Sequence, residues 1–174
     1  MTARLLTLTL LLAPLIASAQ QPDWHAGSIA NLSASITTLS PADQKGIEQV
    51  VHQPPESLHA LRVDTPSTHL FLIQASDDKS CDVRRNCAAW IISSDYRVLL
   101  NTSTPHFKIQ TTLHAGLPDL LTSDAGFNDT GTFQQWRFDG TTYRLSACAT
   151  YTSHDSFNDT YGSPRTTPYP CPTN

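Results

Sequence analysis

Charge is scarce in this 174-residue chain, and glutamate is scarcer still. Charged residues make up 15% of the sequence, and Glu48 and Glu56 are its two glutamates. Because nucleic acids and anionic membranes select proteins with clustered lysine and arginine, this mildly acidic, hydroxyl-rich composition argues against both partners. A glycosidase needs two carboxylates across a cleft, so it would have to use aspartates such as Asp119 and Asp139. Both are expected in turns, where aspartate bonds to nearby backbone.

Common catalytic and cofactor motifs are missing as well. The chain contains no G-x-S-x-G, H-E-x-x-H, Walker, G-x-G-x-x-G or EF-hand pattern. His106 and His114 flank one predicted strand and would lie about 25 Å apart along it, too far to share a metal ion. We therefore expect no metal, no cofactor and no enzyme of a common class. The alternative function is an extracytoplasmic hydrolase, whose pocket would bring a titratable group to one of four residues at strand ends: Asp119, Asp139, His106 or His114.

No apolar run is long enough to span a bilayer, but the first 19 residues have the pattern of a secretory signal peptide. Arg4 gives the positive start, residues 5–16 the apolar centre and residues 17–19 an A-x-A cleavage signal. The sequence therefore predicts a secreted or periplasmic protein with no membrane span after cleavage. Loss of Arg4 with the leader changes the formal charge from −4 to −5.

Cysteine occurs only four times, at Cys81, Cys87, Cys148 and Cys171. An even number in an exported chain favours two disulfides, and the paired spacing of a zinc site is absent. Loop closure favours local pairs, 81 with 87 and 148 with 171. In the chain-entropy model these bonds contribute about 2 and about 3.5 kcal/mol. Two other pairings stay open: 81–148 with 87–171, and 81–171 with 87–148.

The apolar pattern changes from a helical to a strand period near residue 58. Ser40, Pro41 and Asp43 predict the start of a helix, and the prolines at 54–55 predict its end. Asp139-Gly140 predicts a type I′ turn between the last two strands. Seven or eight short strands are expected, at residues 58–63, 70–75, 90–92, 98–100, 107–113, 118–121, 132–138 and 142–149.

This pattern predicts a mainly β (α+β) fold, an antiparallel meander that forms a small barrel or sandwich with one N-terminal helix. After the signal peptide of residues 1–19, residues 20–39 form a lead segment and residues 40–152 the β-rich domain. Residues 153–174 are a Pro/Ser/Thr-rich tail, expected to be coil and tied down through Cys171. Large aromatic side chains are expected in the core rather than on a sugar-binding face, namely Trp90, Trp136, Phe138 and Tyr143.

Several segments together resemble a known group of proteins. Residues 70–74 (LFLIQ) precede Cys81, Asn86, Cys87 and Trp90, and the later segments are residues 99–100 (LL), 116–121 (GLPDLL) and 136–140 (WRFDG) with Tyr143. Over roughly residues 58–146 the chain is similar to exported bacterial proteins with a C-G-x-x-G-N-C-x-x-W loop. The resemblance implies export, a short disulfide loop and a β-rich fold, and it implies no activity. Between the cysteines this chain has DVRR where the group tends to have glycines, which permit positive φ.

The loop between Cys81 and Cys87 is the best candidate contact surface. A disulfide would fix its shape, and Arg84 and Arg85 are of a residue type favoured at protein interfaces. The nearby acids Asp77, Asp78 and Asp82 have the chemistry of a calcium loop, but the two arginines oppose a cation, so internal pairing is expected. We therefore expect a non-enzymatic binding, inhibitor or envelope-accessory module whose partner is another exported protein or an envelope component.

Overall fold

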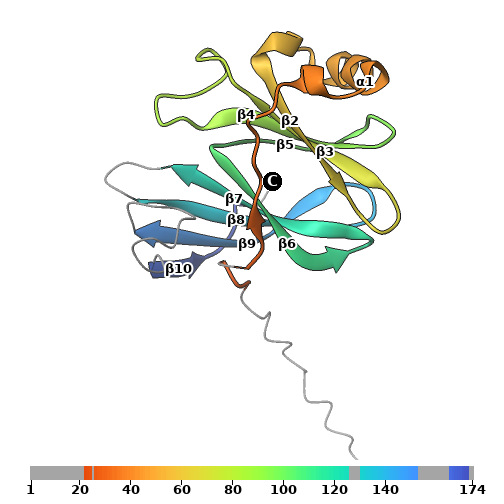
Figure 1. Ribbon diagram of the computed structural model, residues 1–174. Helices are drawn as coiled ribbons and strands as arrows, with labels where there is room; N and C mark the ends of the chain where they lie inside the picture. Colours follow the sequence, from red (N-terminus) through yellow and green to blue (C-terminus); the bar gives the residue numbers. More distant parts are fainter. Residues whose placement is uncertain (1–21, 25, 126–129, 153–164, 173–174) are drawn as a thin grey trace, which may run out of the picture.

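Two antiparallel sheets are stacked face to face, and one helix covers the outer face of the smaller sheet (Figure 1). The computed structural model describes residues 22–24, 26–125, 130–152 and 165–172. The four-stranded sheet contains β2 (Leu58–Asp64), β3 (His69–Ala75), β4 (Cys87–Ser93) and β5 (Val98–Thr104) in that order. The six-stranded sheet contains, in spatial order, β1 (Ser28–Ile29), β6 (His106–His114), β7 (Leu117–Ala125), β8 (Thr130–Phe138), β9 (Tyr143–Thr152) and β10 (Arg165–Tyr169).

The expected mainly β fold is confirmed, as an open sandwich rather than a closed barrel. The four-stranded sheet and strands β6 to β10 of the larger sheet are meanders, because consecutive strands pair with one another, whereas β1 joins the larger sheet beside β6. The predicted signal peptide lies outside the described residues. Within the described part of the chain, no helix is long and apolar enough to cross a membrane.

Strand β3 is apolar on both faces because it separates two cores. Leu70 and Leu72 face the six-stranded sheet, whereas Phe71 and Ile73 face the helix α1 (Pro41–Val51). Alternate side chains of a strand point to opposite faces, which explains why this segment has no polar alternation. The aromatic residues expected in the core are buried there, except Phe138, which is half-buried against it.

The predicted helix is confirmed together with its start signals. Ser40 is the N-cap, and its Oγ accepts a hydrogen bond from the backbone N–H of Asp43 at 3.2 Å. Gly46 faces the ring of Tyr96, whose hydroxyl donates to Asp43 Oδ1 at 3.0 Å. The glycine that weakens the helical pattern therefore makes room for an aromatic ring from the β4–β5 loop.

The predicted turn at Asp139-Gly140 is wrong in type. Strands β8 and β9 pair through Phe138 and Tyr143, which leaves a four-residue loop rather than a two-residue one. Asp139 Oδ1 accepts backbone N–H bonds from the residues two and three positions ahead, at 2.8 and 2.9 Å, and so stabilises the wider loop.

The two-residue hairpin turn lies instead between β6 and β7. Ala115 and Gly116 have φ of 47° and 87°, and both central residues of a type I′ turn require positive φ. His114 and Leu117 flank this turn as paired residues. Its signal is weaker than Asp-Gly, because alanine at positive φ is unfavourable.

The C-terminal tail was expected to be coil, but residues 165–169 form strand β10 along β9. Both predicted disulfides are present, Cys81 with Cys87 and Cys148 with Cys171. The second bond holds the tail beside β9, and Pro168 is tolerated because β10 is an edge strand. The lead segment contains β1 and a 3₁₀ helix, η1 (Ile36–Thr38), and a second one, η2 (Pro55–Ser57), follows α1.

Candidate functional site

The loop of residues 81–87, called the disulfide loop below, is closed by two sets of interactions. One is the disulfide bond between Cys81 and Cys87, and the other is the hydrogen bonding of the Asp82 carboxylate. Asp82 Oδ1 accepts the backbone N–H groups of Arg84 and Asn86 at 2.8 and 2.9 Å, and Oδ2 accepts Asn86 Nδ2 at 2.9 Å. Hydrogen bonds from Asn86 and then from Arg84 lower the pKa of Asp82, so it stays ionised in this role. The loop is therefore a fixed shape.

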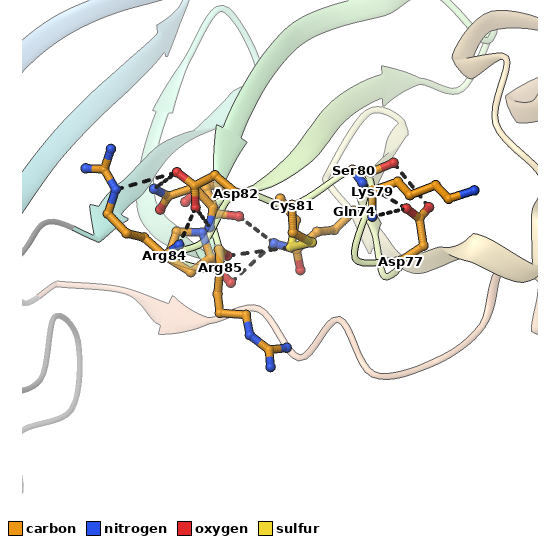
Figure 2. Close-up of a disulfide and its surroundings, with 12 residues drawn as sticks. Gln74, Asp77, Lys79, Ser80, Cys81, Asp82, Arg84 and Arg85 are labelled. Carbon is orange, nitrogen blue, oxygen red and sulfur yellow. Dashed lines mark hydrogen bonds and ion pairs between the residues drawn. A yellow bond between two sulfur atoms is a disulfide. The ribbon is translucent and has the colours of Figure 1, made fainter.

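This fixed loop presents one apolar and two basic side chains. Val83 is 93% exposed, an unusual position for a valine, and Arg84 and Arg85 are exposed beside it. Arg84 lies against Asp82, with 3.7 Å between Nε and Oδ2, whereas Arg85 points away from this pair (Figure 2). Arg85 has φ of 66°, so the loop reaches the left-handed conformation without a glycine at this position.

The acidic residues near the disulfide loop stabilise separate turns rather than gathering around one point. Asp77 Oδ1 accepts the backbone N–H groups of Lys79 and Ser80 at 2.9 and 2.8 Å (Figure 2). The hydrogen bonds from Ser80 lower the pKa of Asp77. Among the described residues, no group of three or more His, Cys, Asp or Glu side chains could hold a metal ion. The internal pairing expected for this loop is present.

A second cluster, which contains His114 and Asp119 from the predicted hydrolase candidates, lies in the six-stranded sheet near the β6–β7 turn. Asp119 was expected in a turn, but it lies in β7 and its side chain is fully buried. His114 Nδ1 lies 2.6 Å from Asp119 Oδ1, and Arg137 Nε lies 3.4 Å from Oδ2. The histidine and arginine side chains are 38% and 42% exposed. A buried carboxylate thus faces two basic groups that reach solvent.

Irregular strand pairing makes room for this carboxylate. The register of β6 against β7 shifts between Ile109 and Leu113, opposite the position of Asp119. The register of β8 against β9 also shifts, between Gln135 and Trp136. Such bulges redirect side chains and occur often beside functional sites. The spacing of five residues between His114 and Asp119, across a two-residue turn, was the available signal for their contact.

Uncharged side chains connect the cluster across the sheet. Gln135 Nε2 donates to Gln110 Oε1 at 2.8 Å and lies 3.5 Å from Asp119 Oδ2. Ser146 Oγ donates to Gln135 Oε1 at 3.1 Å. On the inner side of the sheet, burial and then the charge of Asp119 raise the pKa of Tyr143, whose hydroxyl donates to a backbone carbonyl. The cluster is therefore held by strands β6 to β9 together.

The residues proposed for a hydrolase are brought together only in part. His114 and Asp119 meet, as that alternative requires, whereas Asp139 stabilises its own loop. Three cavities of about 520, 480 and 400 Å³ lie elsewhere, and of these four residues only His106 lines one of them. Comparison of the chain with protein-family models, curated proteins and solved structures found no match. The function therefore has to be inferred from the geometry itself.

Proposed function

We propose that the protein is an exported, non-enzymatic binding module that acts as an inhibitor or accessory of another exported or envelope protein through its disulfide loop. The observation that carries the proposal is the fixed presentation of Val83 between an anchored Asp82 and two arginines. Export is supported by the leader pattern of residues 1–19 and by two disulfides, which persist in oxidising compartments.

Rigidity is what makes the disulfide loop suitable for binding. A loop that is already held in one shape loses little conformational entropy on association. Asn86 is buried at the base of the loop, so the exposed residues rest on an anchored neighbour. Arginine is enriched among the residues that dominate interface energies, and an exposed valine adds apolar area to the contact. The expected partner surface is acidic around a small apolar patch.

A hydrolase is the second candidate function, and one observation favours it. The carboxylate of Asp119 orients the ring of His114, and such a pair can act as a general base. Hydrolysis of a model ester by the purified protein that disappears in His114→Ala would support this candidate. Activity that is unchanged in the variant would exclude His114 from it.

The binding proposal is tested by capture from the native secretome or periplasm. The double variant Arg84→Ala/Arg85→Ala should reduce recovery of the main partner by about tenfold, because interface arginines contribute strongly to affinity. The melting temperature should stay within about 2 °C of wild type, since both side chains are exposed. The matched control is Arg62→Ala/Arg97→Ala, which removes the same charge from exposed positions elsewhere. Equal recovery with both double variants would contradict a role of the disulfide loop.

A further inference from the structure

Two arginines lie side by side at the end of the sheet that carries His114. Arg137 on β8 and Arg144 on β9 are directly paired, so their side chains leave the same face of the sheet. The β6–β7 turn and the β8–β9 loop are at this same end, which brings His114 to the same region. Like charges directly opposite each other destabilise a sheet, so this pairing requires compensation.

The compensation comes from one acidic partner for each arginine. Arg137 Nε lies 3.4 Å from Asp119 Oδ2, and Arg144 Nε lies 3.1 Å from Asp139 Oδ2. Both acids therefore contact the inner nitrogen of a guanidinium rather than its two terminal nitrogens. Asp119 is fully buried, while the Arg144 side chain is 71% exposed. Both guanidinium groups reach solvent, whereas of their two acidic partners Asp119 is buried and Asp139 is 40% exposed.

Arg137 is balanced in charge without being satisfied in hydrogen bonding. Its Nε is buried, and the 3.4 Å contact with Asp119 lies outside hydrogen-bond geometry. Burial of a carboxylate costs several kcal/mol unless it is well paired, so an ordinary sheet face would place an apolar residue at position 119. Departures of this kind from local rules are expected at functional sites.

We propose that Arg137, Arg144 and His114 form a binding site for an oxyanion, the carboxylate or phosphate group of a ligand. The terminal nitrogens of the two guanidinium groups can donate to oxygens of one anion, a geometry for which arginine is suited. Asp119 is a positioning residue, because it acts on the ligand only through His114 and Arg137.

This oxyanion site is separate from the disulfide loop. Arg84 of that loop lines a cavity with Asp124 and Thr130, which lie at the opposite ends of β7 and β8 from Asp119 and Arg137. Neither surface includes a residue of the other, so the two proposals fail or succeed independently. A ligand that carries an oxyanion can therefore bind without occupying the protein-binding surface.

The oxyanion site is tested by titrating the ¹⁵N-labelled full chain with inorganic phosphate, sulfate and acetate at constant ionic strength. The arginine Nε–Hε and histidine ring signals report binding, and the acetate and phosphate arms distinguish a carboxylate ligand from a phosphate ligand. We expect saturable shifts at Arg137, Arg144 and His114 with at least one anion. Arg144→Gln should raise the dissociation constant about tenfold, which is the equivalent of losing one charge-assisted hydrogen bond.

The matched control is Arg62→Gln, because Arg62 Nε contacts Asp64 Oδ1 at 2.9 Å in a similar exposed pair on β2. This variant should leave the dissociation constant unchanged. Absence of saturable shifts with all three anions would overturn the proposal, as would unchanged binding in Arg144→Gln. An equal loss in both variants would also overturn it, because it would indicate general charge attraction rather than a site. Arg144 is largely exposed, so its replacement leaves the fold intact.

Discussion

At Asp139 the carboxylate accepts two backbone N–H bonds and pairs with Arg144, and these contacts lower its pKa from 3.8 to about 2. Backbone donors are the largest cause, followed by the arginine. Asp77 and Asp82 have lowered pKa values for the same main reason, hydrogen bonds from the residues that follow them in a turn. Asp119, by contrast, meets side chains from other strands. The surroundings of each aspartate, rather than its residue type, set its role.

These carboxylates make the fold sensitive to acid. A folded-state pKa below the unfolded value gives stability that is present above the unfolded pKa and is lost as pH falls through the folded pKa. For Asp139 the window therefore extends from 3.8 down to about 2. We expect the melting temperature to fall across this window, and the fall to be smaller in Asp139→Asn. NMR titration of the Asp139 carboxyl carbon with a midpoint near 3.8 would contradict the lowered pKa.

Among the elements, α1 contains a residue of low helix propensity, Gly46, at a position where a tertiary contact requires it. Glycine in the middle of a helix costs about 1 kcal/mol relative to alanine. At Gly46, however, an added Cβ would lie 2.5 Å from the ring of Tyr96. The ring is held there by its hydrogen bond to Asp43, one turn earlier on the same helix. The helix therefore loses propensity and gains close packing against the β4–β5 loop.

The packing explanation predicts that Gly46→Ala is destabilising. The overlap with the Tyr96 ring should cost about 1–3 kcal/mol of unfolding free energy, more than the gain in helix propensity. In a Tyr96→Ala background the clash is absent, and the same Gly46→Ala change should stabilise the protein by about 1 kcal/mol. Urea denaturation of the four proteins measures this cycle. A stabilising effect of Gly46→Ala in the wild-type background would show that the ring moves aside.

For the whole molecule, the two disulfides act at different distances along the chain. The bond between Cys81 and Cys87 closes a separation of 6 residues and shapes a loop. The bond between Cys148 and Cys171 closes a separation of 23 residues and holds the last strand at the edge of the larger sheet. A longer closed loop restricts the unfolded chain more, so the second bond should stabilise the fold more strongly.

Removal of each bond separately tests this difference. Cys148→Ala/Cys171→Ala should lower the unfolding free energy by about 3.5 kcal/mol, and Cys81→Ala/Cys87→Ala by about 2 kcal/mol. Denaturant unfolding of the two double variants gives both values. Only Cys81→Ala/Cys87→Ala should also weaken capture of the protein partner, because this variant removes the bond that closes the disulfide loop. The reverse order of stabilities would show that native contacts of β10, rather than chain entropy, decide the effect.

Much of the fold could be predicted because its signals are local. The cap at Ser40, the apolar runs of the strands and the preference for local disulfides each depend on neighbouring residues, and the structure has all three. The strand β10 could not be predicted, because its threonines and proline carry no apolar period. It forms where Cys171 delivers the tail to an open sheet edge.

The sequence by itself determined the strand and helix segments, the disulfide loop and its exposed arginines, since these depend on residues a few positions apart. Only the tertiary structure decided that Asp119 meets His114 and Arg137, and that Arg137 lies beside Arg144. Those contacts depend on register shifts in two strand pairs, and one residue of register moves a side chain to the other face of a sheet. No local pattern specifies such a shift, because it results from how both sheets pack around their shared core.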